Sequence, residues 1–300
     1  MTEIYVSLPK KENIDFYLEN PIQGFFLGIE NFSINFNHYI KLEELDDYIN
    51  IVKKRNKLIY ITLNKLFYDS QIDDLKKLLF DLSKYDIAGV TFCDASVYNI
   101  VKENNLNINL VWNSYHLGTN YKTVEFWQKR KIEKILLSTE LTIDEIIDIK
   151  KKTNMKVGVF LYGYLNMATS SRSLISNYFS FIGKEKKYDK YYMEDKISNK
   201  KYPIVEKKGE TNFFSAEVLN GIEYFPKLIK NDIDFIELND YMIESNKFYN
   251  IMETFCALIN APEDKEFVKK LKQVGDANTD VKTSDGFLNK KTVFKVKDYE

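Results

Sequence analysis

The sequence is poor in the residues that most often carry metal chemistry. Its 300 residues include two cysteines, two histidines, five prolines and eleven glycines. No cysteine pair has metal or cluster spacing, and two histidines exclude a histidine-rich metal centre. We therefore expect no metal site, and we interpret Cys93 and Cys256 as small buried apolar residues.

Several catalytic and targeting patterns are also missing. The chain has no HExxH, no GxSxG and no phosphate-binding glycine loop. No apolar run approaches the ~20 residues that a membrane helix needs, and the start MTEIYVSLPKK does not resemble a signal peptide. The formal net charge is -1, which excludes a strongly basic nucleic-acid binder but allows a local basic patch. We expect a cytoplasmic protein with neither a membrane nor DNA as partner.

Short apolar segments alternate with stretches of helical period along most of the chain. Helices are predicted at 42–54, 71–83 and 142–152, the last with a Thr142–Glu145 capping-box spacing. Eight segments are β-branched or aromatic and almost continuously apolar, as in strands buried on both faces of a parallel sheet: 4–8, 24–29, 58–63, 88–92, 108–112, 134–137, 156–162 and 235–238. This order predicts an α/β fold, a complete or incomplete (β/α)₈ TIM-like barrel.

The regular alternation breaks after Tyr162. The stretch 160–179 reads as a strand, then Gly163, then a polar turn, then an apolar restart. Such a turn is where a barrel strand delivers side chains to a site. Segment 184–215 alternates in character, which predicts a β-hairpin insertion before a helix at 218–230.

The end of the chain predicts a short addition to the barrel. Residues 292–296 alternate, which is typical of an edge strand or an ordered arm. We predict a barrel over 1–265 that includes the insertion 184–215, and a C-terminal extension over 266–300 packed on it. No Pro/Gly-rich linker suggests a second independent domain.

Polar residues follow most of the predicted strands, where barrels of this kind place their chemistry. As candidates for proton transfer and anion binding we take Glu140, His116 and Arg172. The substrate-binding candidates are Asn64, Asn113, Asn120, Tyr164, Asn166 and Ser171. The alternative is that individual members are helix caps or local hydrogen-bonding residues.

The predicted insertion has its own charge signature. Residues 184–208 hold nine lysines and five acids, interleaved with tyrosines. Lysines with aromatic residues could track an RNA backbone and stack on bases, and the alternative is an ordinary solvated hairpin. The RNA-binding candidates are Lys184, Lys186, Lys187, Lys200 and Lys201.

Four stretches in order resemble the collagenase-like peptidase family U-32. They are 111–127, 135–146 with a serine–x–glutamate–leucine pattern at Ser138–Leu141, 160–179 and 285–297. Many members of that family hold cysteines after the strand-seven glycine that help to bind an iron–sulfur cluster. This chain has serines there, and Cys93 and Cys256 alone cannot build a four-thiolate cluster. It therefore resembles the short, cluster-less branch, and we expect no cofactor within it.

The resemblance implies RNA chemistry more than proteolysis. Well-studied relatives hydroxylate pyrimidines in RNA, including the wobble uridine of tRNA. We expect a component of tRNA wobble-uridine 5-hydroxylation, with tRNA as a partner and either a longer cluster-bearing relative or self-association. Two alternatives stay open: a collagenase-like peptidase, and a non-catalytic partner subunit. Whether the chain is itself an enzyme is left open.

Overall fold

Eight parallel strands close into a barrel in the computed structural model, which describes residues 2–290. The last strand, β12, pairs with both the first strand and β8, which closes the ring. All eight predicted strands are present, and apart from the end of β8 their bounds lie within two residues of the prediction, so the barrel is confirmed. The strands are β1 (Glu3–Ser7), β2 (Gly24–Ile29), β4 (Leu58–Leu63), β5 (Gly89–Phe92), β6 (Leu110–Asn113), β7 (Lys134–Leu136), β8 (Lys156–Ser170) and β12 (Phe235–Leu238).

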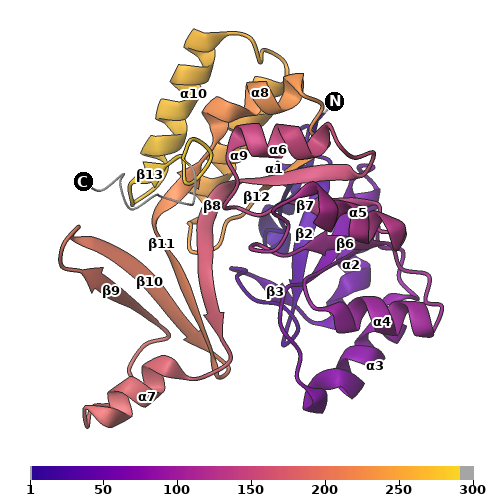
Figure 1. Cartoon of the computed structure of the whole chain (residues 1–300), viewed down its shortest axis with the longest axis vertical. Helices are drawn as coiled ribbons and strands as arrows, with labels where there is room; N and C mark the ends of the chain where they lie inside the picture. Colours follow the sequence, from indigo (N-terminus) through magenta and orange to yellow (C-terminus); the bar gives the residue numbers. More distant parts are fainter. Residues whose placement is uncertain (1, 291–300) are drawn as a thin grey trace.

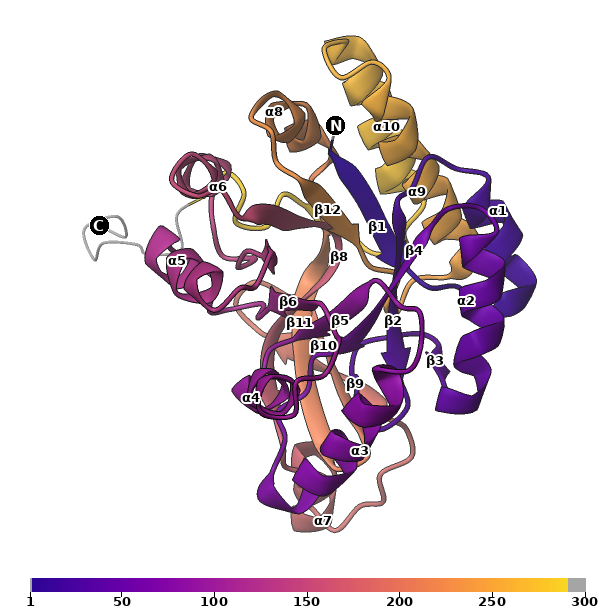
Figure 2. The same ribbon diagram turned by 90° about the vertical axis from the view of Figure 1, so that its right-hand side faces the viewer.

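Amphipathic helices surround the barrel (Figure 2). They are α1 (Ile14–Leu18), α2 (Leu45–Lys53), α3 (Ile72–Leu82), α4 (Ala95–Glu103), α5 (Tyr121–Lys129), α6 (Ile143–Lys150), α8 (Phe225–Lys230), α9 (Ser245–Ile259) and α10 (Lys265–Ala277). The Thr142–Glu145 capping box at the start of α6 is confirmed, because the threonine hydroxyl and the glutamate satisfy backbone donors that the first turn leaves free. None of the helices in residues 2–290 is long and apolar enough to span a membrane.

An aromatic layer fills the amino-terminal half of the barrel interior. The Lys134 ammonium lies 5.2 Å from the ring of Tyr5, 5.1 Å from that of Tyr60 and 5.7 Å from that of Phe235. These residues come from four different strands, so they meet only inside the barrel. Because side chains alternate along a strand, residues two positions further on also point inward. This identifies the residues that lie above the layer, toward the carboxyl ends.

A projecting arm, residues 164–217, leaves the barrel at β8 (Figure 1). It consists of the outer half of β8, helix α7 (Leu174–Phe181) and the strands β9 (Lys190–Asp195), β10 (Lys200–Lys207) and β11 (Glu210–Asn220). In the arm the strands pair antiparallel, in the order β8-β11-β10-β9. One sheet therefore runs from the closed barrel into an open arm.

The predicted polar turn after Gly163 is wrong, because β8 continues without a break to Ser170. Gly163 has a φ of 133° and lies where β8 leaves the barrel; a Cβ there would be 2.8 Å from the Asn239 carbonyl oxygen. Only glycine tolerates that backbone and that approach. The glycine redirects the strand and does not end it.

The predicted bounds of the insertion are also wrong. It begins within β8 rather than at residue 184, and it contains α7 and a third antiparallel strand besides the hairpin. The helix predicted at 218–230 starts late, because 218–220 still pair with β8. A short 3₁₀ turn, Ile222–Tyr224, then leads into α8 with Pro226 in its first turn.

Glu206 fixes α7 to the sheet of the arm. Its carboxylate accepts hydrogen bonds from the Ile175 and Ser176 backbone N–H groups at the start of α7, and Lys186 Nζ lies 2.8 Å away. Burial raises the pKa of Glu206, but the bonds from Lys186 and Ser176 outweigh it and hold the pKa at about 2. The carboxylate is thus charged and anchors the helix start.

After α9 the chain returns across the barrel. Helix α10 packs on α9, and β13 (Thr283–Ser284) pairs in parallel with β11. The edge strand predicted at 292–296 lies outside the described residues, and the division of the chain at residue 265 stays a prediction.

Candidate functional site at the barrel mouth

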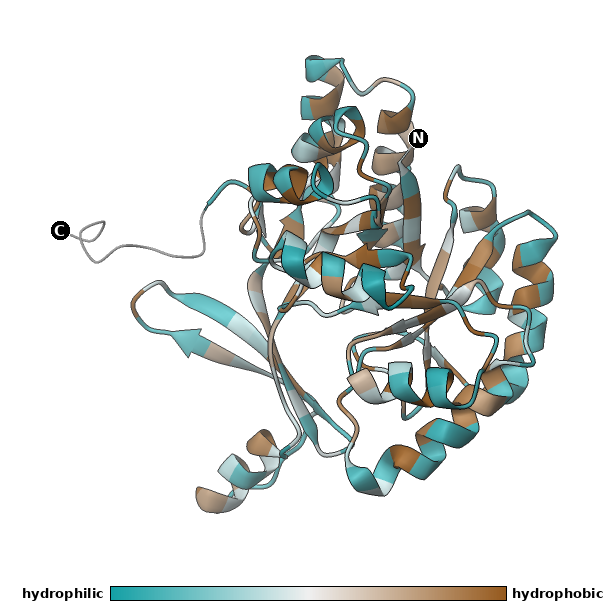
Figure 3. Cartoon of the chain, turned by 45° about the vertical axis from the view of Figure 1, so that its right-hand side comes forward, coloured by the Kyte–Doolittle hydropathy of each residue, from teal (hydrophilic) through white to brown (hydrophobic). Residues whose placement is uncertain are grey.

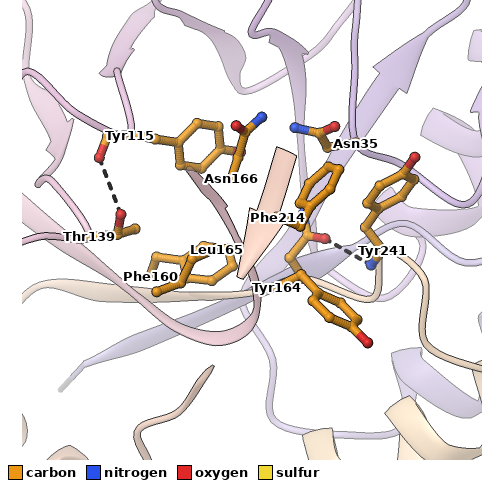
Figure 4. A pocket seen from close by; sticks show the side chains of 10 residues that line it. Asn35, Tyr115, Thr139, Phe160, Tyr164, Leu165, Asn166, Phe214 and Tyr241 are labelled. Atoms are coloured by element: carbon orange, nitrogen blue, oxygen red, sulfur yellow. Dashed lines mark hydrogen bonds between the residues drawn. The ribbon is translucent and has the colours of Figure 1, made fainter. Parts of the chain in front are cut away.

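A small cavity lies where the arm joins the carboxyl ends of the barrel strands (Figure 4). The barrel and its loops contribute Asn35, Tyr115, Thr139, Phe160, Asn239 and Tyr241, and the arm contributes Tyr164, Leu165, Asn166 and Phe214. The lining combines five aromatic rings with three carboxamides. Its free space is about 10 Å³, about enough for one water molecule. A larger ligand would enter only if lining side chains moved.

The arm is packed onto the mouth by apolar contacts next to this cavity. Phe214 is 1% exposed and lies 5.3 Å from the Tyr241 ring, with Val205 in the same cluster. Lys65 pairs with Glu210, and Lys208 Nζ lies 3.1 Å from a Glu30 oxygen. The arm therefore forms one wall of the cavity.

Tyr115 lines the cavity and also contacts a buried polar layer. Burial raises the pKa of its hydroxyl well above the ordinary value, and the charge of Glu237 raises it further, while the Asn64 and Asn113 side chains lower it. The phenol is therefore protonated at neutral pH. It lies among side chains from the ends of β4, β6 and β12.

Glu237 is the central member of this layer. It lies in β12 two residues after Phe235, so it faces the barrel interior above the aromatic layer, and it is 3% exposed. Burial raises its pKa to about 7, and a hydrogen bond with Asn239 opposes the rise. Such a carboxyl holds or releases a proton near neutral pH.

Several buried polar atoms around Glu237 lack hydrogen-bond partners within residues 2–290. They are Thr62 Oγ1, Thr91 Oγ1, Asn113 Oδ1 and Glu237 Oε2. Thr62 and Thr91 face each other on neighbouring strands. Native structures leave few buried polar groups unpaired, and those that remain point to bound water, a ligand or a functional role. These four atoms are therefore open to a water molecule or a ligand.

The candidate pair His116 and Glu140 does come together, on the rim of the mouth. His116 Nδ1 lies 3.3 Å from Glu140 Oε1, and the two side chains are 40% and 45% exposed. Neither lines the cavity. A solvated pair of this kind contributes little binding energy.

The structure separates Arg172 from that pair. It is exposed and lies between the outer end of β8, at Ser170, and the start of α7, at Leu174. Ser171 lies in the same turn. Neither residue lines the cavity, so the combination of Glu140, His116 and Arg172 in one site is not observed.

The amide candidates divide into structural and cavity residues. The Asn64 amide bonds both the N–H and the carbonyl of Ile34, which holds the loop after β2 over the mouth. Asn120 caps α5. Asn113 lies in the buried layer, and Tyr164 and Asn166 line the cavity itself.

The lysine candidates all lie on the arm. Lys186 and Lys200 are engaged in pairs, the latter with Glu217 at 3.1 Å. Lys184, Lys187 and Lys201 are exposed. Only these last three are clearly presented to a partner.

Sequence reasoning missed Glu237, Phe160, Phe214 and Tyr241. Glu237 had a readable signal, because it is a carboxylate inside the apolar strand Phe235–Leu238, and such a residue is rarely buried without a partner. The aromatic residues had none, since their pattern is that of any core residue. Only the fold brings β8, β11 and β12 together around them.

The cysteines do not fit a metal cluster. Cys93 follows β5 and Cys256 lies in α9; burial raises the pKa of both thiols to about 12. Thiolates, which bind metals, are thus disfavoured. In the part of the chain that the structure describes, no three His, Cys, Asp or Glu side chains are placed to hold a metal ion.

Comparison with known proteins places the chain in a family. The model of peptidase family U32 matches residues 10–297. The chain is 26% identical to the tRNA hydroxylation protein P2 of Bacillus subtilis, over 90% of this chain and 92% of that protein. It is 23% identical to the tRNA hydroxylation protein P1 of the same species, over 85% of this chain and 64% of the longer relative.

A solved structure supports the fold. The U32 peptidase Mk0906 superposes with a TM-score of 0.50 at 10% identity, over 80% of this chain and 92% of that one. Together with the family match over nearly the whole sequence, these likenesses agree with the resemblance carried by segments 111–127, 135–146 and 160–179. The chain belongs to peptidase family U32.

Proposed function

We propose that this protein takes part in tRNA hydroxylation, specifically of the wobble uridine at C5, as the component that holds the pyrimidine base. The observation that carries the proposal is the cavity of Tyr115, Phe160, Phe214 and Asn166 at the barrel mouth. Aromatic faces stack on a base, and carboxamides match its hydrogen-bonding edge. The names of the B. subtilis relatives P1 and P2 support tRNA as the substrate.

The base would have to leave its stack and open the cavity. Enzymes that act on bases commonly extrude the nucleotide into a pocket of this kind. The arm forms one wall, so a shift of Tyr164–Asn166 would make room. Glu237 would then lie below Tyr115, where it could hold or release a proton next to the ring.

Hydroxylation also needs an oxygen donor and the removal of two electrons from the ring. The two thiols of this chain do not fit a cluster, so we assign it base binding and assign the redox step to a longer family member acting with it. We propose a cytoplasmic location, where tRNA is modified. No serine approaches a histidine among the hydrogen bonds of residues 2–290: His38 contacts Tyr48 and His116 contacts Glu140. No side-chain arrangement within residues 2–290 favours peptide hydrolysis.

Mass spectrometry of tRNA nucleosides from a strain that lacks the gene tests this function. The 5-hydroxyuridine-type wobble nucleosides should disappear or fall sharply, and return when the gene is restored. Unchanged amounts would contradict the proposal. A second strain that lacks the longer family member controls for the redox partner, and it should show the same loss.

We also propose that Lys184, Lys187 and Lys201 contact tRNA phosphates. Changing all three to glutamate should weaken tRNA binding and reduce the slope of log Kd against log salt by about 2. Lys76→Glu, an exposed residue of α3, is the matched control and should change neither. An unchanged salt slope in the triple variant would show that these lysines do not meet the RNA.

A further inference from the structure

The outer edge of the arm is an unusual surface for a protein without a partner. More than half of the exposed large hydrophobic side chains in the described residues lie in the arm. Phe181 is 89% exposed and Ile197 is 95% exposed. Figure 3 shows hydrophobic segments on α7 and at the tip of the β9–β10 hairpin, away from the barrel. A concentration of this kind marks an interaction surface.

The edge strand β9 is also unprotected. Among residues 2–290 it is the last strand of the sheet, and its one pairing there is with β10. Residues 200–203 of β10 have no second neighbour within residues 2–290, because the pairing of β10 with β11 covers Ile204–Lys207. The outer hairpin is thus a two-stranded ribbon, which is marginally stable in water without a further strand. An open edge of this kind is a template for pairing with another chain.

The sequence of β9 is complementary to itself. Two copies of β9 can pair antiparallel about a two-fold axis at Tyr192. Each residue then faces the residue of the other copy that lies equally far from Tyr192 on its other side. Lys190 then faces Glu194, Tyr191 faces Met193, and Tyr192 faces its own copy. Opposite charges and aromatic pairs at facing positions stabilise antiparallel strands. A two-fold interface needs such a self-complementary surface.

We propose that two copies of this chain associate through their β9 edges and join the two arms into one continuous sheet. The self-complementary order of β9 favours a second copy as this partner, because Lys190 and Glu194 pair across the axis and the exposed side chains of Tyr192 and Met193 are covered there. The pairing gives the outer hairpin third and fourth strands. The barrel mouths stay outside the interface, since the cavity lies at the base of the arm. The proposal does not rest on the proposed function.

Charge reversal tests the register. Light scattering should show the intact chain, of 35.4 kDa, as a concentration-dependent dimer. Lys190→Glu alone and Glu194→Lys alone each create two like-charge pairs across the two-fold axis, and each should raise the dimer Kd about tenfold. The two changes together restore opposite charges and should restore the dimer. Circular dichroism confirms that all variants fold.

A crosslink gives an independent readout. Tyr192→Cys places one thiol of each copy at the two-fold axis, so mild oxidation should give a covalent dimer. Ile197→Cys, equally on the hairpin but beyond the strand, should crosslink much less. The raised pKa values of Cys93 and Cys256 keep these thiols protonated and slow to oxidise. A chain that stays monomeric at about 100 μM would overturn the proposal. So would a dimer indifferent to all three charge variants, or an arm that binds only tRNA or only a longer family member.

Discussion

The barrel and the arm are parts of one sheet, yet they differ in strand direction, in burial and in the contacts that hold them together. In the barrel the strands are parallel, buried on both faces and almost wholly apolar, and their few inward polar residues are concentrated above an aromatic layer. In the arm the strands are antiparallel, mostly solvated, and held by charged contacts such as Glu206 with Lys186. The barrel can therefore place a site precisely, whereas the arm offers surface to partners.

The junction between these regions depends on Gly163, and the largest effect is expected there. Gly163→Ala should lower the free energy of unfolding by about 3 kcal/mol, because the new methyl group meets the Asn239 carbonyl at a φ of 133°. Chemical denaturation of the variant and of the natural chain measures this loss in the free energy of unfolding.

Gly183→Ala is the matched control for the junction. Its φ is also positive, at 67°, but no atom lies within 4 Å of the added Cβ, so its cost should be only about 1 kcal/mol. Equal losses for the two variants would mean that backbone conformation alone, and not the contact with the barrel, sets the requirement.

The buried layer makes barrel stability depend on pH through Glu237. Burial raises its pKa from 4.5 to about 7, so the fold binds the proton more tightly than the unfolded chain. The stabilisation is complete below pH 4.5 and is lost as the pH rises to about 7, a change of about 3 kcal/mol.

Glu237→Gln removes this titration while keeping the shape of the side chain. Relative to the natural chain, the variant should gain about 3 kcal/mol between pH 4 and pH 8 in denaturation experiments. Parallel pH profiles for the two proteins would show that the carboxyl is solvated and not part of a closed layer. Burial also raises the pKa of Asp240, to about 6. Asp240 titrates in both proteins, so its contribution cancels in the difference between their pH profiles.

Most of the barrel could be predicted from the sequence. A continuous apolar strand such as 58–63 is typical of one environment, a parallel sheet that is buried on both faces. The arm could not. Its strand β8 crosses from buried to solvated surroundings at Gly163, and a glycine followed by polar residues is as typical of a turn as of a redirected strand. The local sequence pattern does not distinguish a turn from a redirected strand. The segment is a strand because it pairs antiparallel with β11.

The site shows the same limit. Asn166 and Tyr164 were predictable as polar or amphipathic residues beyond a barrel strand, and both line the cavity. Arg172, only a few residues further on, is carried away from the mouth by the extended strand. Phe214 and Tyr241 are distant in sequence and meet only because β11 folds back. Pairing between distant segments brings these residues together, and the spacing of residues in the sequence does not reveal that pairing.

Within the arm, Glu206→Ala should act locally. The loss of a buried charged acceptor should cost about 2 kcal/mol, and it should appear as faster hydrogen exchange at 174–181 with unchanged protection in β4 and β5. Glu194→Ala, a solvated carboxylate of the same arm, should leave exchange in α7 unaltered. Faster exchange throughout the barrel would show that the arm and the barrel unfold as one unit.

The central claim is that the cavity at the barrel mouth, and not the arm surface, holds the base. The direct measurement is the wobble nucleoside content of tRNA in a strain that lacks the gene and carries either Asn166→Ala or Asn177→Ala. Asn166 lines the cavity, while Asn177 is an exposed residue of α7. We predict that the first variant restores less than about a tenth of the hydroxylation, as for a lost base contact of at least 1.4 kcal/mol, and that the second restores all of it. Full restoration by a stably folded Asn166→Ala protein would contradict the account.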